Sequence, residues 1–457
     1  MTRVRRRLLA IAAILVLAFC YHAGATMHSR AMNTQRVRAD QSGYLWDAVA
    51  INQGRHGGPE TLIGERNRMP VYPWLLSWLY DPAMSPDEFF AVAKRWNIWM
   101  SMVLLAILAG IAFGPLPPLI ALNFVLVIAF GCYIFKAGYA QVELLFYLLF
   151  FLTFLACWKL LRAETTAATL SYGAGAGVLT ALTHLSKAAM LPFVGIVLLV
   201  LGLRAASPLF ARGSAAAASA RTRQVMVRVA GGGVFVVCFL AVLWPYISNS
   251  KKYFGHYFYN VNSTFYVWYD DWPAASMGTF QDGDGKGWPT TPPDEIPSMR
   301  KYLREHTARQ IADRFLNGFR EMITVSYTRL WYFKFTAMYV LFALALVVTG
   351  WQRFLALVRA QPYVFLFMVL YGVGYAAAVA FYQPISGTSL RMLLVHIAPL
   401  LFVLSRLSAH PSFHDLQWNV AGVAVRPIHF HLLMLVTILF DMAFVLPWRL
   451  TADFAGY

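Results

Sequence analysis

Long apolar runs are the feature that most restricts how this chain can fold. Stretches of about 20 apolar residues are long enough to cross a bilayer as helices, which satisfy their own backbone hydrogen bonds. Eleven runs in the 457-residue chain fit this pattern. They cover residues 8–27, 97–114, 116–135, 140–161, 168–186, 189–203, 229–248, 333–350, 362–382, 391–407 and 428–447. The sequence therefore predicts an all-α polytopic membrane protein.

Composition agrees with a membrane protein and argues against a nucleic-acid partner. Only 13% of the residues are charged, whereas about a quarter are charged in soluble domains. The net charge is +17, but the basic residues are scattered over the loops between apolar runs and form no continuous cationic stripe. The four cysteines all lie inside apolar runs without CxxC spacing, so neither a disulfide framework nor a zinc site is indicated.

The basic residues also orient the predicted bundle. If the N-terminal "RVRRR" lies in the cytoplasm, every sizeable loop on that side is basic, as the positive-inside rule requires. We therefore predict an integral multi-pass protein of the cell (inner) membrane with a cytoplasmic N-terminus. Two long segments, 28–96 and 249–332, are then expected on the periplasmic or outer face.

This arrangement predicts that the chain has three parts. Residues 1–248 are predicted to form an N-terminal transmembrane module with the first outer loop at 28–96. Residues 249–332 form a second outer loop with an aromatic stretch and an amphipathic helix, and residues 333–457 form C-terminal transmembrane helices. The first run could instead be a cleaved signal peptide, since a basic start and "AGA" fit that pattern. A retained helix keeps the charge bias of the other spans consistent.

Local signals predict short elements in the outer loops. A helix is expected after Asp40, and another begins at Ser85, where Glu88 completes a capping box, and continues into the second span. The proline-containing "GERNRMPVYPWLLSWLY" is predicted to be irregular and strand-like. From Ser298, one amphipathic helix is expected to lead into the eighth predicted span.

The motifs "ADQSGY" and "RMPVYPWLL", in this order after the first span, carry a resemblance to a known family. With the two long outer loops and an Arg that opens a late helix, the chain resembles GT-C class membrane glycosyltransferases. It is similar to family 39, which includes protein mannosyltransferases and aminoarabinose transferases of lipid A. The resemblance implies sugar transfer from a polyprenyl-phosphate donor to a lipid, glycan or protein acceptor. Many relatives have two adjacent acids in the first loop, whereas Gln41 follows Asp40 here.

Such a transfer needs a base for the acceptor hydroxyl and cations for the departing phosphate. Asp40 is the candidate catalytic base; an N-cap or a salt bridge to Arg36 or Arg38 is the structural alternative. Asp47 is expected to support the site or to be a surface acid.

The expected substrate-binding residues follow from the motifs and from charges at the outer ends of helices. Arg68 suits phosphate oxygens or the catalytic carboxylate, and Lys187 and Arg391 are outward cations whose alternative role is snorkelling to headgroups. Glu143 opens the fourth span, and pairing with Lys136 is its structural alternative. The complete expected set is Tyr44, Asp47, Arg66, Arg68, Tyr72, Glu143, Lys187 and Arg391.

Cofactor use and the class of function are left open by the sequence. A divalent metal ion could bridge an acid and the phosphate, but no His, Asp or Glu spacing assigns its ligands. Expected partners are the lipid-linked sugar donor, its acceptor and membrane lipids. A transporter or flippase of lipid-linked glycans and a non-catalytic envelope assembly protein remain alternatives. No repeat relates the two halves, and most acids lie in outer loops, which favours surface chemistry.

Overall fold

Nine helices in the described part of the chain are long and apolar enough to cross a membrane. The structure is a computed structural model that describes residues 3–54, 68–210, 215–281, 292–386 and 390–452. The nine are α1 (Arg3–Met32), α4 (Pro86–Phe113), α5 (Pro118–Gly131) with η2 (Tyr133–Phe135), α6 (Glu143–Arg162), α9 (Ala215–Phe254), α14 (Leu330–Thr349), α16 (Pro362–Ser386), α17 (Leu390–Leu394) with α18 (Ile397–Ser408), and α19 (Pro427–Phe440) with η7 (Asp441–Val445) and α20 (Leu446–Arg449). The predicted all-α polytopic class is confirmed.

The two other predicted spans are helices that differ from these nine in length or composition. Helix α7 (Thr166–Ser186) has 21 residues, about 31 Å at 1.5 Å per residue, but is rich in Gly, Ser and Thr. Helix α8 (Leu191–Ala206) has 16 residues and is shorter than the others. Nine of the eleven predicted runs therefore meet both criteria for a membrane span.

Small residues let α7 pack closely against α9. A Cβ on Gly173 would lie 2.6 Å from the carbonyl oxygen of Gly231, and one on Gly177 would lie 2.4 Å from that of Phe235. Only glycine allows the backbones to come this close, which is a common way for helices to associate inside membranes. This packing explains why α7 is less apolar than its neighbours.

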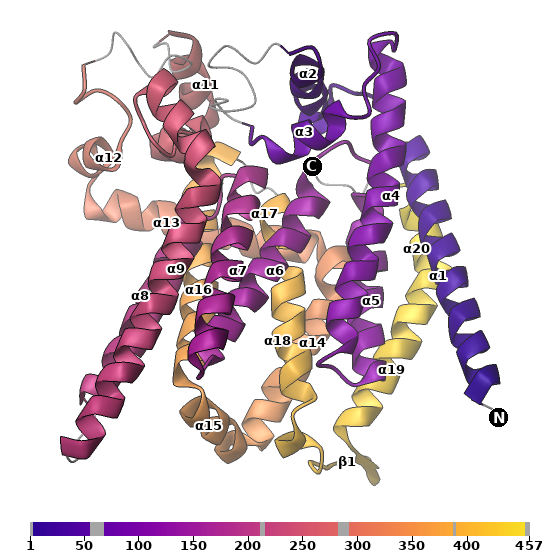
Figure 1. Cartoon of the computed structure of the whole chain (residues 1–457). Helices are drawn as coiled ribbons and strands as arrows, with labels where there is room; N and C mark the ends of the chain where they lie inside the picture. The colour runs from indigo at the N-terminus through magenta and orange to yellow at the C-terminus, as the bar shows by residue number, and fades with distance from the viewer. Residues whose placement is uncertain (1–2, 55–67, 211–214, 282–291, 387–389, 453–457) are drawn as a thin grey trace.

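The helices run side by side, with short elements gathered at the two ends of the bundle (Figure 1). The upper end in Figure 1 contains α2 (Gln41–Asn52), α3 (Val71–Ser77), α11 (Trp272–Gln281) and α12 (Met299–Glu305), while α13 (Ala308–Thr328) extends across the spans near that level. The short elements η1 (Arg38–Asp40), α10 (Val261–Thr264) and η4 (Tyr266–Trp268) belong to the same two loops. The lower end contains α15 (Trp351–Ala360) and the hairpin of β1 (Trp418–Val420) with β2 (Val423–Val425).

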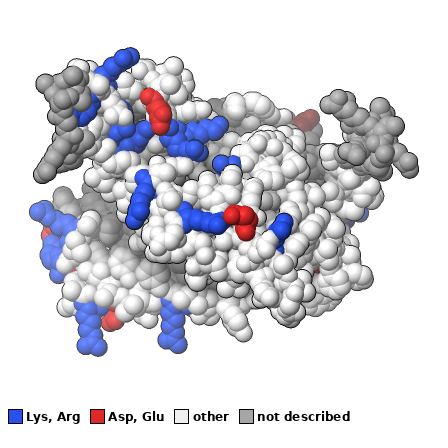
Figure 2. Space-filling model, turned by 90° about the horizontal axis from the view of Figure 1, so that it is seen from below, with Lys and Arg blue, Asp and Glu red and all other residues white. Residues whose placement is uncertain are grey.

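Basic side chains are spread over the lower end of the bundle. Figure 2 shows this face with many Lys and Arg residues in blue and few acids in red. The last turns of α6, α8 and α18 carry Arg162, Arg204 and Arg406, respectively.

Two predictions for the outer loops are confirmed at their helix starts. Helix α2 follows Asp40, with Ala48 and Ile51 buried on one face. Helix α4 begins with the expected capping box between Ser85 and Glu88 and continues without a break into a membrane-length helix.

Two other predictions for these loops are wrong. The stretch predicted to be strand-like contains helix α3, because Pro70 is its N-cap and Pro73 lies in its first turn, where no backbone N–H is needed for an intrahelical bond. The single amphipathic helix expected from Ser298 is two helices. Helix α12 ends before His306, and Thr307 starts α13 with a capping box of its own.

Candidate functional site

Charged side chains from four distant parts of the chain meet at the upper end of the bundle. Arg391, on α17, places Nη1 2.9 Å from Oδ2 of Asp40 and 3.5 Å from Oε1 of Glu143. Lys187, which follows α7, places Nζ 3.5 Å from the same Glu143 oxygen. The structure therefore brings together the predicted base, the acid of the fourth predicted span and two of the predicted cations.

The two acids of this cluster lie in different environments. The Glu143 side chain is 3% exposed, and its Oε2 atom has no hydrogen-bond partner among the described residues. The Asp40 side chain is 65% exposed. Glu143 is thus a fixed buried charge between cations, whereas the Asp40 carboxylate is accessible to a ligand.

The Asp40 side chain does not act as a cap, and Arg36 pairs with a different acid. Asp40 occupies the N-cap position of α2, but its side chain makes no capping hydrogen bond and its φ is 65°. Arg36 contacts Asp87 instead, at 3.5 Å, and the Asp40 carboxylate pairs with Arg391. The exposed carboxylate is therefore held by a cation that is 351 positions away in the chain.

A left-handed backbone supports the Asp40 carboxylate. Both Ala39 and Asp40 have positive φ, at 62° and 65°. For a residue with a Cβ this region costs about 1–2 kcal/mol, although Asp tolerates it better than most residues. Backbone strain of this kind is concentrated at functional sites.

A third predicted cation pairs with the second acid of the first outer loop. Arg68 Nε lies 2.9 Å from Asp47 Oδ2, and the Asp47 side chain is only 8% exposed. Helix α2 accommodates the guanidinium because Gly43 has no side chain: a Cβ there would lie 2.3 Å from Arg68 Nη2. Asp47 is therefore a buried partner of Arg68 rather than a surface acid. Arg66 lies outside the described residues.

The two predicted tyrosines line the inner side of this loop. Tyr44 and Tyr72 pack edge to face with ring centroids 5.4 Å apart, and Tyr72 donates a hydrogen bond of 3.1 Å to Asn97. Burial raises the pKa of Tyr44 well above its usual range, and the nearby Glu143 adds to this effect. Tyr44 therefore remains a neutral phenol beside the charged cluster.

Burial lowers the pKa of both lysines near Glu143. Lys136 is 4% exposed, and desolvation lowers its pKa to about 8, although Glu143 opposes that change. Burial also lowers the pKa of Lys187, again opposed mainly by Glu143. Glu143 thus makes ion pairs with Lys187 and Arg391, both at 3.5 Å. Its charge also acts on Lys136, through its electrostatic effect on the pKa of that lysine.

Metal ligands are not assigned by the geometry. Within the described ranges, no three His, Cys, Asp or Glu side chains are grouped closely enough to hold a metal ion. His184 and His28 are buried at the upper end of the bundle, and His28 Nδ1 lies 2.9 Å from the carbonyl oxygen of Leu450.

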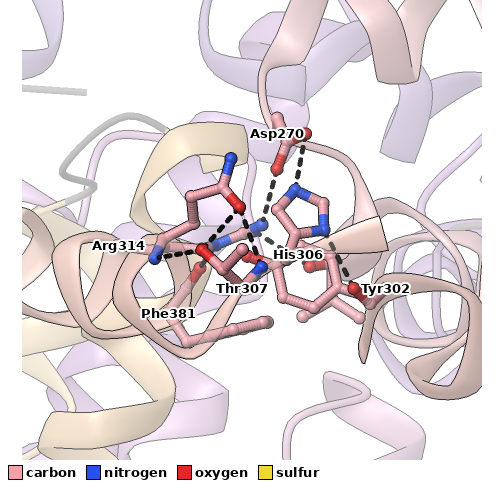
Figure 3. Close-up of polar contacts among 8 residues, drawn as sticks. Asp270, Tyr302, His306, Thr307, Arg314 and Phe381 are labelled. Atoms are coloured by element: carbon pink, nitrogen blue, oxygen red, sulfur yellow. Dashed lines mark hydrogen bonds and ion pairs between the residues drawn. The ribbon is translucent and has the colours of Figure 1, made fainter. Parts of the chain in front are cut away.

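A second polar cluster, not predicted from the sequence, ties the outer loop to the bundle. Arg314 on α13 donates hydrogen bonds to the carbonyl oxygens of Phe381, at 2.8 Å, and Val267, at 3.0 Å (Figure 3). Asp270 accepts from His306 Nε2 at 3.1 Å and contacts Arg314 at 3.5 Å. No local pattern indicates this cluster, because its members come from η4, the loop before α11, the junction between α12 and α13, α13 itself and α16.

Comparison of this chain with known proteins gives no guide to the site, so its chemistry is derived from its geometry. No family model, characterised protein or solved structure matches this chain. The arrangement combines an accessible carboxylate, a buried carboxylate and several partly buried cations at one end of an apolar bundle. Chemically, it can accept a proton from a hydroxyl and can bind an anionic group next to the membrane.

Proposed function

We propose that this chain is a membrane glycosyltransferase, which moves a sugar from a polyprenyl-phosphate donor to an acceptor hydroxyl on the outer face of the membrane. The observation that carries the proposal is the shared guanidinium of Arg391. It joins the exposed carboxylate of Asp40 to the buried carboxylate of Glu143. One cation therefore lies where it can bind either a protein carboxylate or a ligand phosphate.

The charges of the cluster favour an anionic ligand. Lys136, Lys187 and Arg391 contribute three positive charges, and Asp40 and Glu143 contribute two negative charges, which leaves one positive charge in excess. A cluster with more cations than anions attracts a negatively charged ligand. A lipid phosphate can bind there while its tail stays in the bilayer.

The reaction that fits these groups is a single displacement. Asp40 takes the proton of the acceptor hydroxyl, and the oxygen forms a bond to the anomeric carbon of the sugar. The bond between that carbon and the phosphate oxygen breaks, and its electron pair leaves with the polyprenyl phosphate. Arg391 and Lys187 stabilise the negative charge that develops on the leaving phosphate.

Arg391 can change partners during this cycle. In the structure its Nη1 atom contacts Oδ2 of Asp40, so one of the two carboxylate oxygens is engaged by the guanidinium. A donor phosphate next to Arg391 competes for the same N–H groups and releases Asp40 toward the acceptor. Glu143, which contacts both Arg391 and Lys187, keeps the two cations in place during the exchange.

The orientation in the membrane follows from the basic lower end of the bundle. Placing that end in the cytoplasm puts Asp40 and Arg391 at the periplasmic or outer surface of a cell (inner) membrane. The proposal therefore includes a cytoplasmic N-terminus and an outward site.

The test is a comparison of cell-envelope lipids, glycans and proteins by mass spectrometry. Membranes from a deletion strain are compared with membranes that express wild type, Asp40→Asn or the control Asp313→Asn, which changes an exposed acid of α13. We expect a sugar adduct to disappear in the deletion, to fall at least about 100-fold in Asp40→Asn, and to persist in the control. The mass of the adduct identifies the sugar class and the acceptor.

Two outcomes oppose the proposal. Full transfer by Asp40→Asn at equal protein level shows that Asp40 is not the base. An unchanged envelope in the deletion strain favours a transporter of lipid-linked glycans or a non-catalytic assembly protein. Those two alternatives are separated by testing whether lipid-linked sugars accumulate on the inner leaflet.

A further inference from the structure

The short loop between η2 and α6 is buried along its whole length. Residues 136–142 are all buried, so their backbone N–H and C=O groups cannot rely on water. Side-chain amides bind some of these backbone groups in place of water. Asn97 Nδ2 donates to the carbonyl oxygens of Ala137, at 3.0 Å, and Tyr139, at 2.7 Å. The loop is thereby fixed to α4, and Glu143 follows it directly as the first residue of α6.

A pair of amides joins the same loop to the strained corner before α2. Asn33 and Gln41 are 0% exposed and exchange two hydrogen bonds of 2.8 Å. Asn33 also donates to the carbonyl oxygen of Gly138, at 2.8 Å. Gln41 Oε1 accepts from the N–H of Ala140, at 2.8 Å, and Nε2 donates to the carbonyl oxygen of Arg38, at 2.9 Å. Nδ2 of Asn33 and Nε2 of Gln41 therefore each donate two hydrogen bonds.

The corner held by this pair is the one that presents Asp40. Ala39 and Asp40 are consecutive left-handed residues, a conformation that persists only where the surroundings fix it. Gln141, from the buried loop, donates to the carbonyl oxygen of Ala39. Two glutamines thus hold the corner. Gln41, the next residue in the chain, binds the carbonyl oxygen of Arg38, and Gln141, on the facing loop, binds that of Ala39.

We infer that Gln41 and Asn33 are positioning residues, which aim the Asp40 carboxylate at the site shared with Glu143 and Arg391. The inference rests on the proposed function, because it assigns the two amides a role in transfer through Asp40. Neither amide reaches the ligand, since both are fully buried. Their effect is to make Asp40 and Glu143 parts of one rigid unit built on the 136–142 loop.

This role also explains why an amide rather than a second acid follows Asp40. Gln41 uses its Nε2 group as a double donor, toward Asn33 Oδ1 and the carbonyl oxygen of Arg38. A carboxylate at this position would face both oxygens without a proton to donate to either of them. The paired-acid form of the first loop is therefore incompatible with this corner.

The experiment measures transfer by the purified full-length protein in detergent. The probe is the polyprenyl-phosphate-sugar fraction extracted from host membranes, used in a dilution series, with product quantified by mass spectrometry. The variants are Gln41→Glu, the reciprocal swap of Asn33→Gln with Gln41→Asn, Asp40→Asn, and the matched control Gln35→Glu at an exposed position of the same loop. Folded protein is counted by gel filtration.

Positioning predicts a loss of rate without a loss of donor binding. We expect Gln41→Glu to lower the maximal rate per folded molecule by about tenfold or more, because small misplacements of a catalytic group have effects of this size. The half-saturating donor dilution should stay within about twofold of wild type. The reciprocal swap should regain part of the rate, and Gln35→Glu should match wild type.

Results that differ from these contradict either the positioning inference or the assignment of Asp40 as the base. If Asp40→Asn is inactive while Gln41→Glu transfers at the wild-type rate per folded molecule, the positioning inference is wrong and the proposed function stands. If Asp40→Asn is fully active, the base assignment and the positioning inference both fail. If Gln41→Glu does not fold, Gln41→Met removes the same hydrogen bonds without adding charge. An unchanged rate per folded molecule in that variant also overturns the inference.

Discussion

Arg391 and Asp40 are 351 positions apart in the sequence, yet Nη1 of the arginine lies 2.9 Å from Oδ2 of the carboxylate. The same nitrogen lies 3.5 Å from Glu143, whose side chain is almost fully buried. A planar guanidinium can bind two carboxylates at once, whereas an ammonium group is a single point charge. Both contacts use Nη1, and we expect the fork of the guanidinium, as well as its charge, to matter when a ligand phosphate binds.

The first prediction concerns Arg391→Lys, which keeps the charge and removes the fork. We expect sugar transfer to fall by at least about 100-fold, because one ammonium group cannot hold Glu143 and bind a phosphate in the geometry of a guanidinium. The measurement is envelope mass spectrometry at matched protein level. Arg309→Lys, at a side chain that is 92% exposed, is the control. Equal transfer by both variants would show that only the charge at position 391 is used.

The second prediction concerns Gly43→Ala. The new Cβ would come within 2.3–2.6 Å of three atoms of the Arg68 guanidinium group, so the Arg68 and Asp47 pair has to shift. We expect a loss of about 1–3 kcal/mol in the free energy of unfolding together with reduced transfer. Thermal unfolding in detergent measures the first effect. Gly175→Ala, where no atom lies within 4 Å of the new Cβ, should leave stability unchanged or raised. If Gly175→Ala lost as much stability as Gly43→Ala, a steric clash with Arg68 would not explain the effect.

The third prediction uses the pKa of Lys136, which burial lowers to about 8. An unfolded lysine titrates near pH 10.4, so between about pH 8 and pH 10.4 the unfolded chain binds more protons than the folded protein. Stability should therefore rise with pH across this window, by about 3 kcal/mol in total. Transfer should fall over the same window, because the positive charge beside the phosphate is lost.

The check on Lys136 is a comparison with Lys136→Met over pH 7–10. Thermal unfolding of the variant should show a smaller rise in stability than the wild type, because Lys187 still contributes, and its transfer should be low throughout. Parallel stability profiles for the two proteins would mean that Lys136 is not the group that titrates.

The fourth prediction concerns the cluster that joins α13 to the bundle. Arg314→Leu removes two hydrogen bonds to backbone carbonyls and the contact with Asp270, and its side chain is only 5% exposed. We expect faster hydrogen exchange in α12 and α13 and a loss of about 1–3 kcal/mol in stability, because two backbone carbonyls lose their donor. Arg309→Leu on the same helix should change neither quantity by more than a few tenths of a kcal/mol. Unchanged exchange in Arg314→Leu would mean that the cluster does not hold the outer loop.

Local patterns in the sequence predicted the helices well, because apolar length and capping are local properties. The capping box at Ser85 and the helix after Asp40 lie where the pattern placed them. The error at α3 arose from reading Pro70 and Pro73 as helix breakers. In a first turn those prolines remove no intrahelical hydrogen bond.

Long-range pairs could not be predicted in the same way. The sequence identified Asp40, Glu143, Lys187 and Arg391 as separate candidates, but only the packing of four helices shows that they share one cluster. From the sequence alone, Gln41 is only a departure from the paired acids of similar proteins. Its role in the corner depends on the buried 136–142 loop, which is about 100 positions away.

The order of residues along the chain has a consequence for how the protein is made. Asp40 and Glu143 are synthesised early, whereas Arg391 lies on α17, at the start of the second-last membrane-length segment among the described residues. A nascent chain therefore carries the exposed carboxylate through most of its insertion without the guanidinium that pairs with it. The site is completed only when the final segments of the bundle assemble, so a chain truncated before residue 390 contains the proposed base but lacks the cation that would bind the donor.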